Sequence, residues 1–193
     1  MPVTETTICN GALLLLSEAP ITSLQQANEQ ARMCNESYPV ARRMCLQMHD
    51  WKFATRRALL TRLEATPPFG YQYKYQLPVD ILSISSVYPP DMCYTIEDDE
   101  LLTDYSAPGI IYTIDVEDTG RFSPLFVVAL ELVLASRLCM AIAEKQGLRE
   151  SFKQELVSML LQAKIRDTKM NPSQMPIDVE MDQVRRTVES VWD

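Results

Sequence analysis

The chain of 193 residues has few glycines, and their wide spacing excludes one class of functional site. The five glycines are Gly11, Gly70, Gly109, Gly120 and Gly147, and no two of them lie closer than eleven positions. Phosphate-binding loops such as the P-loop and the dinucleotide fingerprint need glycines only a few positions apart. We therefore expect no nucleotide-binding loop and no cofactor.

Histidine is scarcer still, and the cysteines are not spaced as metal ligands. His49 is the only histidine, and the five cysteines are scattered along the chain without a C-x-x-C pair. Zinc sites need several such ligands that converge at recognisable spacing, and a Ser or Cys nucleophile is commonly activated by a histidine. We therefore expect no metal site, no catalytic residues and no enzymatic activity. Scattered cysteines, odd in number, are typical of reduced and mostly buried thiols.

The chain also lacks a segment suited to cross a membrane. Its longest apolar stretch, residues 125–143, contains Glu131 and Arg137, which suits a buried helix better than a membrane span. Glu5 stands near the start, where a secretory signal would need a basic residue. We expect no membrane anchor and no secretory leader.

Basic residues are almost missing from the middle of the chain. The formal net charge is −8, from 26 acidic and 18 basic residues. Residues 67–122 contain ten acidic and two basic residues, whereas residues 1–66 and 123–193 are close to neutral. No Lys or Arg lies between Lys74 and Arg121. Such a chain has no electrostatic reason to coat nucleic acid or an anionic membrane.

The N-terminal third is predicted to form two helices. Apolar residues at helical spacing predict a first helix over about residues 4–17, with Thr4 or Thr7 as its N-cap. A second helix is expected over about residues 28–48, and Pro39 inside it should kink or break it.

Two further helices are predicted near the C-terminal end. Ser123 and Pro124 predict the start of a helix that runs to about residue 143. This helix is apolar on nearly every face, so we expect it to be central and covered all round. Gly147 should end it, and a one-sided amphipathic helix is expected over residues 149–169.

Between these helical parts the hydrophobic period changes to two, which indicates β-strands. Strands are expected over residues 58–63, 71–77, 81–88 and 110–116. The first two should pair as a hairpin across the turn at residues 66–70.

These elements predict a mainly α protein, a helical bundle with a small antiparallel β-sheet insertion (α+β). The bundle would comprise residues 1–57 and 123–170, and the β-rich acidic insertion residues 58–122. Residues 171–193 would form a C-terminal extension with an amphipathic helix.

An acidic cluster in the insertion is the first candidate site; its members are Glu97, Asp98, Asp99, Glu100 and Asp104. Carboxylates can bind a divalent cation or form the acid pair of a glycosidase. The spacing does not match a calcium loop, and a solvated loop and strand edge is the favoured interpretation. If this lobe faces a channel or a neighbouring component of an assembly, its negative charge would instead keep DNA from adhering.

Three alternating tyrosines form a second candidate. Tyr71, Tyr73 and Tyr75 lie on a predicted strand beside Lys74, as in platforms that stack the bases of single-stranded nucleic acid. The surrounding acidic residues would repel phosphates, so sheet core or a subunit interface is favoured.

The C-terminal extension carries apolar residues at alternating spacings of four and three. The members are Ile177, Met181, Val184, Val188 and Val191, with Trp192 beside the last. Such a helix could fold back onto its own core or dock into a groove on a partner. Pro172 and Pro176 before it favour docking slightly.

Several short segments, in this order along the chain, resemble one family of viral proteins. They are Ile8-Cys9-Asn10, Ala12-Leu13, residues 19–24, Ala31, Cys34-Asn35, Tyr38, His49, Trp51, Phe53-Ala54, residues 69–71, residues 75–78 with Asp80, and Phe122 leading into residues 125–143. Together they cover about residues 5–165. In this combination the chain resembles the tail tubular protein A family of short-tailed phages, the head-to-tail adaptor.

The resemblance implies a structural protein of the virion tail, made in the host cytoplasm. Members of the family form a dodecameric homo-oligomeric ring that joins the portal protein to the tail nozzle protein. The ring continues the channel through which the genome is ejected, so DNA passes through without being gripped. By this interpretation the C-terminal helix, Ile177 to Trp192, would dock on the portal.

Two other functions remain open from the sequence. The chain could be a tail-associated peptidoglycan hydrolase that uses Asp98, Asp99 and Glu100, although a general acid needs burial that so hydrophilic a run does not favour. It could also be a host regulatory or scaffolding protein.

Overall fold

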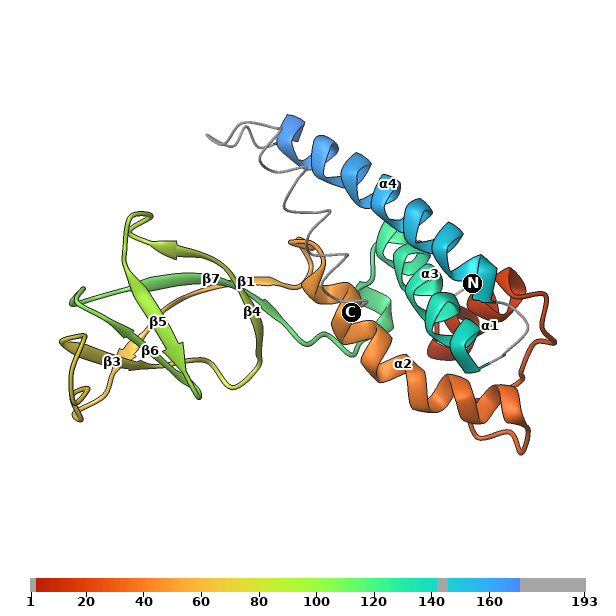
Figure 1. The fold of residues 1–193 in the computed structure, drawn as a ribbon, viewed down its shortest axis with the longest axis horizontal. Helices are drawn as coiled ribbons and strands as arrows, with labels where there is room; N and C mark the ends of the chain where they lie inside the picture. Colours follow the sequence, from red (N-terminus) through yellow and green to blue (C-terminus); the bar gives the residue numbers. More distant parts are fainter. Residues whose placement is uncertain (1–2, 142–145, 171–193) are drawn as a thin grey trace. The chain divides into compact units, whose positions relative to one another are not determined.

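The computed structural model describes residues 3–141 and 146–170, and the chain divides into two compact units. The first unit comprises the segments 1–49 and 117–193, and the second comprises residues 50–116. The described part of the first unit is helical, and the second is built of strands (Figure 1).

The first helix, α1 (Glu5–Leu15), begins at a side-chain cap. Thr4 accepts a hydrogen bond from the Thr7 backbone N–H at 3.1 Å, and the Thr7 hydroxyl accepts one from the Thr4 N–H at 2.8 Å. This reciprocal capping box satisfies amide groups that a helix start would otherwise leave unpaired. It confirms Thr4 as the N-cap.

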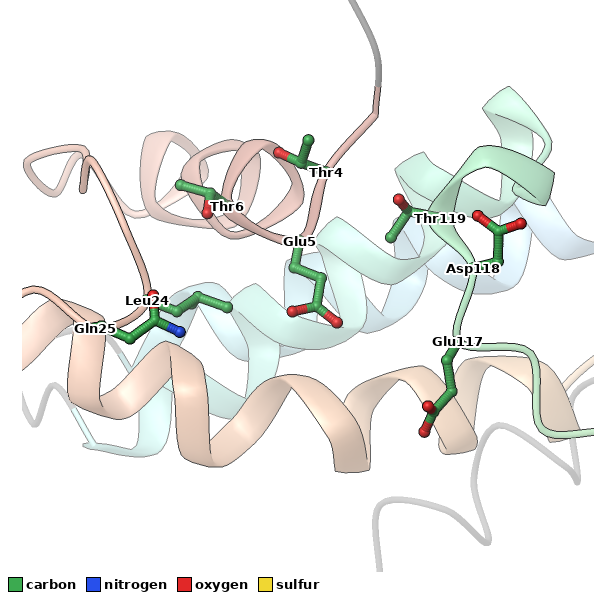
Figure 2. A pocket seen from close by; sticks show the side chains of 8 residues that line it. All are labelled: Thr4, Glu5, Thr6, Leu24, Gln25, Glu117, Asp118 and Thr119. Atoms are coloured by element: carbon green, nitrogen blue, oxygen red, sulfur yellow. The ribbon is translucent and has the colours of Figure 1, made fainter.

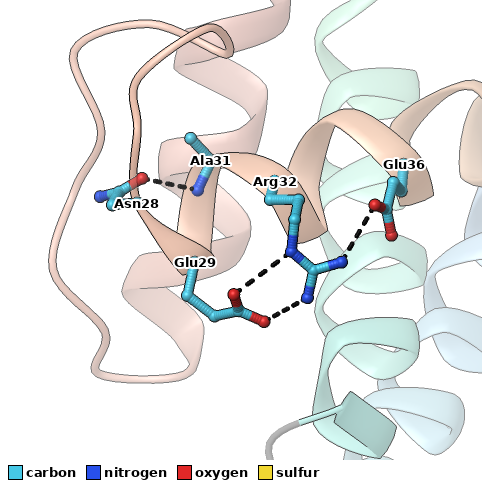
Figure 3. A network of polar contacts seen from close by, with 5 residues as sticks. All are labelled: Asn28, Glu29, Ala31, Arg32 and Glu36. Atoms are coloured by element: carbon cyan, nitrogen blue, oxygen red, sulfur yellow. Dashed lines mark hydrogen bonds and ion pairs between the residues drawn. The ribbon is translucent and has the colours of Figure 1, made fainter.

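The second helix, α2 (Glu29–Gln47), is capped in a similar way (Figure 3). The Asn28 side-chain oxygen accepts from the backbone N–H of Ala31 at 2.9 Å. One turn on, Arg32 forms ion pairs with both Glu29 and Glu36, the second at 3.0 Å. Glu29 in the first turn also suits the positive end of the helix dipole.

The third helix, α3 (Pro124–Ala141), contacts α1, α2 and the fourth helix, α4 (Gln146–Met170). The Ser123 hydroxyl accepts from the Phe126 N–H at 3.3 Å, so Ser123 caps α3 as predicted. Most of the described side chains of α3 are buried, which confirms that this largely apolar helix is central. The stripe on α4 is also confirmed, because Phe152, Leu156 and Leu160 are buried.

Four of the five cysteines are buried, as expected, and Cys93 is exposed. Cys9 of α1 and Cys34 of α2 lie together, and their thiols form a hydrogen bond. The neighbouring Cys34 thiol, and after it burial, hold the pKa of Cys9 above its ordinary value, and burial alone does so for Cys45. These buried thiols act as small apolar side chains of the helical core.

The second unit contains seven short strands, arranged in two antiparallel sheets. They are β1 (Thr55–Leu59), β2 (Thr61–Arg62), β3 (Tyr73–Gln76), β4 (Ile81–Tyr88), β5 (Tyr94–Glu97), β6 (Glu100–Thr103) and β7 (Gly109–Ile114). One sheet has the order β1-β7-β4, and the other has the order β2-β3-β6-β5. The buried Leu60 separates β1 from β2, so the chain passes from one sheet to the other at this residue.

The prediction of a mainly α protein is wrong. The structure is 44% helix and 21% strand, with four α-helices and two antiparallel sheets in its described residues, which makes it an α+β fold. The sequence prediction missed β5 and β6. These strands were missed because the acidic run Glu97–Glu100 interrupts the apolar alternation and has the composition of a loop.

The predicted hairpin between residues 58–63 and 71–77 forms only in part. Thr61 and Arg62 pair with β3, whereas β1 pairs with the distant strand β7 in a register that places Ala58 opposite Ile110. Pairing with β7 places Ala58 beside a buried isoleucine, and burial of this kind can override local pairing.

Two helix-breaking expectations are also corrected. The helix α2 continues through Pro39 without a break, and Gly147 lies in the first turn of α4 rather than ending α3. Packing of α2 against α3 stabilises the segments on both sides of Pro39. A glycine in a first turn interrupts no established helix, so α4 forms around it.

Candidate interaction surfaces

The acidic cluster of the sequence lies mainly at the tip of the β5–β6 hairpin. Glu97 and Glu100 are opposite each other in the strand register, and Asp98 and Asp99 form the turn between them. Asp98 has a φ of 51°, in the left-handed region that Asp tolerates better than most residues. Asp104 lies at the other end of β6, where it accepts a hydrogen bond from the Gln72 N–H at 2.9 Å.

The hairpin tip is strongly negative because it carries four carboxylates and has one lysine beside it. Lys74 on β3 donates to Glu100 at 2.7 Å. Glu100, with weaker contributions from Glu97 and Asp98, raises the pKa of Lys74 above its ordinary value. Glu97, Asp98 and Asp99 are exposed to solvent.

This arrangement does not provide the geometry of a metal site or of an acid catalyst. Within residues 3–141 and 146–170, no group of three or more His, Cys, Asp or Glu side chains could hold a metal ion. A general acid needs burial that raises its pKa, and Asp98 and Asp99 are both exposed. The hairpin tip is therefore a charged surface.

A second feature of the β unit is a shallow apolar hollow on the β1-β7-β4 sheet, with a volume of about 320 Å³. It is lined by Arg57, Ala58, Leu59, Tyr88, Gly109, Ile110 and Ile111. Leu59 is 80% exposed and Tyr88 is 68% exposed, although both side chains are largely apolar. An exposed group of large apolar side chains of this kind commonly marks an interaction site.

Gly109 contributes to the hollow. The register places Gly109 of the central strand opposite Leu59 on one side and Tyr88 on the other. A Cβ atom at Gly109 would lie 3.5 Å from Leu59 Cδ2 and 3.6 Å from Tyr88 Cβ, which are ordinary contacts. The missing side chain therefore leaves space between two large neighbours, and a residue with a side chain could occupy it.

A polar hollow lies in the first unit, with a volume of about 430 Å³ (Figure 2). Its walls are the start of α1, residues 24–25 and the segment 117–119. Glu117 accepts from the buried Arg42 at 3.0 Å, and the Thr119 hydroxyl donates to the Val3 carbonyl at 2.8 Å. These contacts hold the segment 117–119 against α2 and against the residues that precede α1, and they give Glu117 and Thr119 a structural role.

The alternating tyrosines do not form a base-stacking platform. Tyr75 is buried and donates from its hydroxyl to the Tyr105 carbonyl at 2.8 Å. The ring of Tyr73 lies under the guanidinium of Arg62, 4.1 Å from the ring centroid. Both tyrosines therefore stabilise the sheet itself, in agreement with the favoured interpretation.

The portal-docking residues predicted from the sequence, Ile177, Met181, Val184, Val188, Val191 and Trp192, lie outside the described residues. The apolar hollow was missed by sequence reasoning. A glycine directly before a predicted strand, Gly109 before residues 110–116, is the one local signal for it. Leu59 and Tyr88 are brought to Gly109 only by long-range pairing.

Comparison with known proteins identifies no relative: no family model matches the chain, and no curated protein matches it significantly. Among the helices described here, none is both long and apolar enough to cross a membrane.

Proposed function

We propose that this chain is a ring-forming adaptor of a short-tailed phage, joining the portal protein to the tail nozzle. The observation that carries the proposal is that the β unit has two exposed surfaces of different character. One is the acidic β5–β6 hairpin, and the other is the apolar hollow beside Arg57. A ring made of head-to-tail contacts needs two different complementary surfaces on every subunit.

The charge distribution supports the same proposal. DNA binding depends strongly on Lys and Arg side chains that neutralise phosphates. The β unit has ten acidic and five basic residues, and Lys74, the one basic residue of this unit beyond position 66, is paired with Glu100. A subunit of this composition lets DNA pass through a channel without holding it. The dodecameric state and the virion location follow from the resemblance to the tail tubular protein A family.

The first prediction concerns assembly with a portal. Mixing the purified chain with the portal protein of the same phage should yield a closed ring on one end of the portal. Electron microscopy would show the ring, and light scattering would show the added mass. Portal alone and chain alone are the controls. The proposal would be contradicted if the chain stayed monomeric when mixed with a portal protein that still binds its other partners.

The second prediction concerns the C-terminal segment. Deletion of residues 171–193 should weaken attachment to the portal at least tenfold, because it removes the apolar residues at spacings of four and three. Binding would be measured by sedimentation. A variant in which only Ile177, Met181 and Val184 become serine keeps the length and serves as the matched control for chain truncation. Unchanged binding by both variants would exclude a docking role for this segment.

A further inference from the structure

We propose that the acidic β5–β6 hairpin of one copy docks into the apolar hollow on the β unit of the next copy. The inference deepens the proposed function, on which it rests, because it names the two surfaces that close the ring. The occupant of the hollow is therefore a second copy of this chain.

The hollow can accept apolar side chains. Its lining is almost entirely apolar, with Leu59 and Tyr88 on either side of Gly109 and Ile111 also in the lining. A volume of about 320 Å³ corresponds to on the order of ten water molecules. Releasing this water from apolar surface favours docking of a side chain in its place.

The hairpin presents such side chains at an open sheet edge. β5 is the edge strand of its sheet, and all four of its residues are exposed. Tyr94 is 38% exposed and Ile96 is 46% exposed, and they point to the same face because they are two positions apart. An exposed edge strand with apolar side chains is a surface on which another chain can pair or pack.

Charge sets the orientation of the contact. Arg57 is exposed at the rim of the hollow, and it forms no ion pair with any side chain in the described ranges. The hairpin tip carries Glu97, Asp98 and Asp99 beyond the Lys74–Glu100 pair. Opposite charges of this kind fix the register of an interface and disfavour like-to-like pairing of two hairpins.

The two surfaces differ, so the contact is heterologous and extends from copy to copy. A two-fold dimer would bring the same residue of both copies together. A head-to-tail contact brings Ile96 of one copy to Leu59 of another, and neither residue to its own equivalent. This difference can be tested directly with cysteine pairs.

The test uses a Cys93→Ser background, because Cys93 is the exposed cysteine. Two single variants, Leu59→Cys and Ile96→Cys, are purified, mixed at high concentration with and without portal, and oxidised with copper phenanthroline. A cross-linked species is expected in the mixture and not in either variant alone. Ile96→Cys mixed with Val79→Cys is the matched control, because Val79 is fully exposed in the same unit and lies outside the hollow.

A charge exchange provides an independent readout. Arg57→Glu should weaken self-association about tenfold, and adding Asp99→Arg to the same chain should restore it. Lys52→Glu is the matched control, because it makes the same charge change at another exposed position of the β unit. Circular dichroism checks that each variant is folded, and sedimentation velocity measures association.

The outcomes separate this contact from the adaptor proposal. Rings that form on the portal without a Leu59–Ile96 cross-link would overturn the contact and leave the adaptor proposal standing. A cross-link without portal binding would support the contact and count against the adaptor. A chain that is monomeric under every condition would overturn both, and cross-linking in each variant alone would show a two-fold contact in place of the proposed one.

Discussion

Replacing Arg42 with alanine should lower the free energy of unfolding by about 3 kcal/mol. The Arg42 side chain is only 4% exposed, and its guanidinium donates to Glu117 at 3.0 Å. This contact holds the segment before α3 against α2 within the helical unit. Alanine removes both the buried aliphatic stem and the charge, so it loses packing as well as the ion pair.

Two matched variants separate these contributions. Arg42→Met keeps much of the buried stem and should cost about 1 kcal/mol, because no buried carboxylate is left without a partner. Glu117→Gln should cost less than about 1 kcal/mol, since the Glu117 side chain is 76% exposed. Urea unfolding followed by circular dichroism gives all three values. Equal losses for Arg42→Ala and Glu117→Gln would show that the ion pair, and not packing, dominates.

The elements that the sequence predicted well are those set by local chemistry. Thr4 begins α1 and Asn28 begins α2 because each side chain accepts a hydrogen bond from the amide three positions further on. β4 has the predicted bounds, Ile81–Tyr88, because the prolines that follow have no backbone N–H to donate to the ladder with β7. None of these features depends on the rest of the fold.

The sheet arrangement and the hollow could not be derived in the same way. Leu59 and Tyr88 meet around Gly109 through a register that joins Gly109 to Leu59 about fifty positions away and to Tyr88 about twenty positions away. The missed strands β5 and β6 are short, and the turn between them consists of charged residues that resemble a solvated loop. Long-range pairing determines the β1-β7-β4 sheet and the hollow on it. A hydrophobic pattern in one segment does not reveal the strand with which that segment pairs.

The acidic cluster shows how far a charge pattern can be interpreted. The sequence grouped five carboxylates, and the structure brings four of them to one hairpin tip and separates Asp104 from them. Four acidic residues of the insertion therefore lie together at the tip of one hairpin. The exposed apolar residues Tyr94 and Ile96 lie on the same hairpin. The combination of acidic and apolar side chains, rather than the charge alone, makes the hairpin a candidate for protein contact.

Where α1 contacts α3, one carboxylate determines whether a substitution at Gly11 raises or lowers the free energy of unfolding. Gly11 of α1 faces the Glu131 side chain of α3. A Cβ atom at position 11 would overlap Oε1 and Cδ of Glu131 and would lie 2.9 Å from its Cγ. Gly11→Ala should therefore destabilise the protein by about 1–2 kcal/mol, as overpacking outweighs the gain in helix propensity.

Substitution of the carboxylate should reverse this effect. In a Glu131→Ala background the overlap is gone, so Gly11→Ala should stabilise the protein by about 0.5–1 kcal/mol through helix propensity alone. Glu131→Gln keeps the size of the side chain and should give no reversal. Urea unfolding of the four chains of this double-mutant cycle measures the coupling. Equal effects of Gly11→Ala in the Gln and Ala backgrounds would contradict the steric explanation.

The same carboxylate gives a pH dependence of defined sign. Burial raises the pKa of Glu131 above its ordinary value in the folded protein. Below about pH 4 both folded and unfolded chains carry a proton at Glu131, and no stability is lost. As the pH rises, the unfolded chain ionises first, so stability falls until the folded carboxyl also ionises. Glu131→Gln should therefore be more stable than the parent at pH 7, with a difference that disappears below about pH 4; a difference independent of pH would show that ionisation of Glu131 is not its cause.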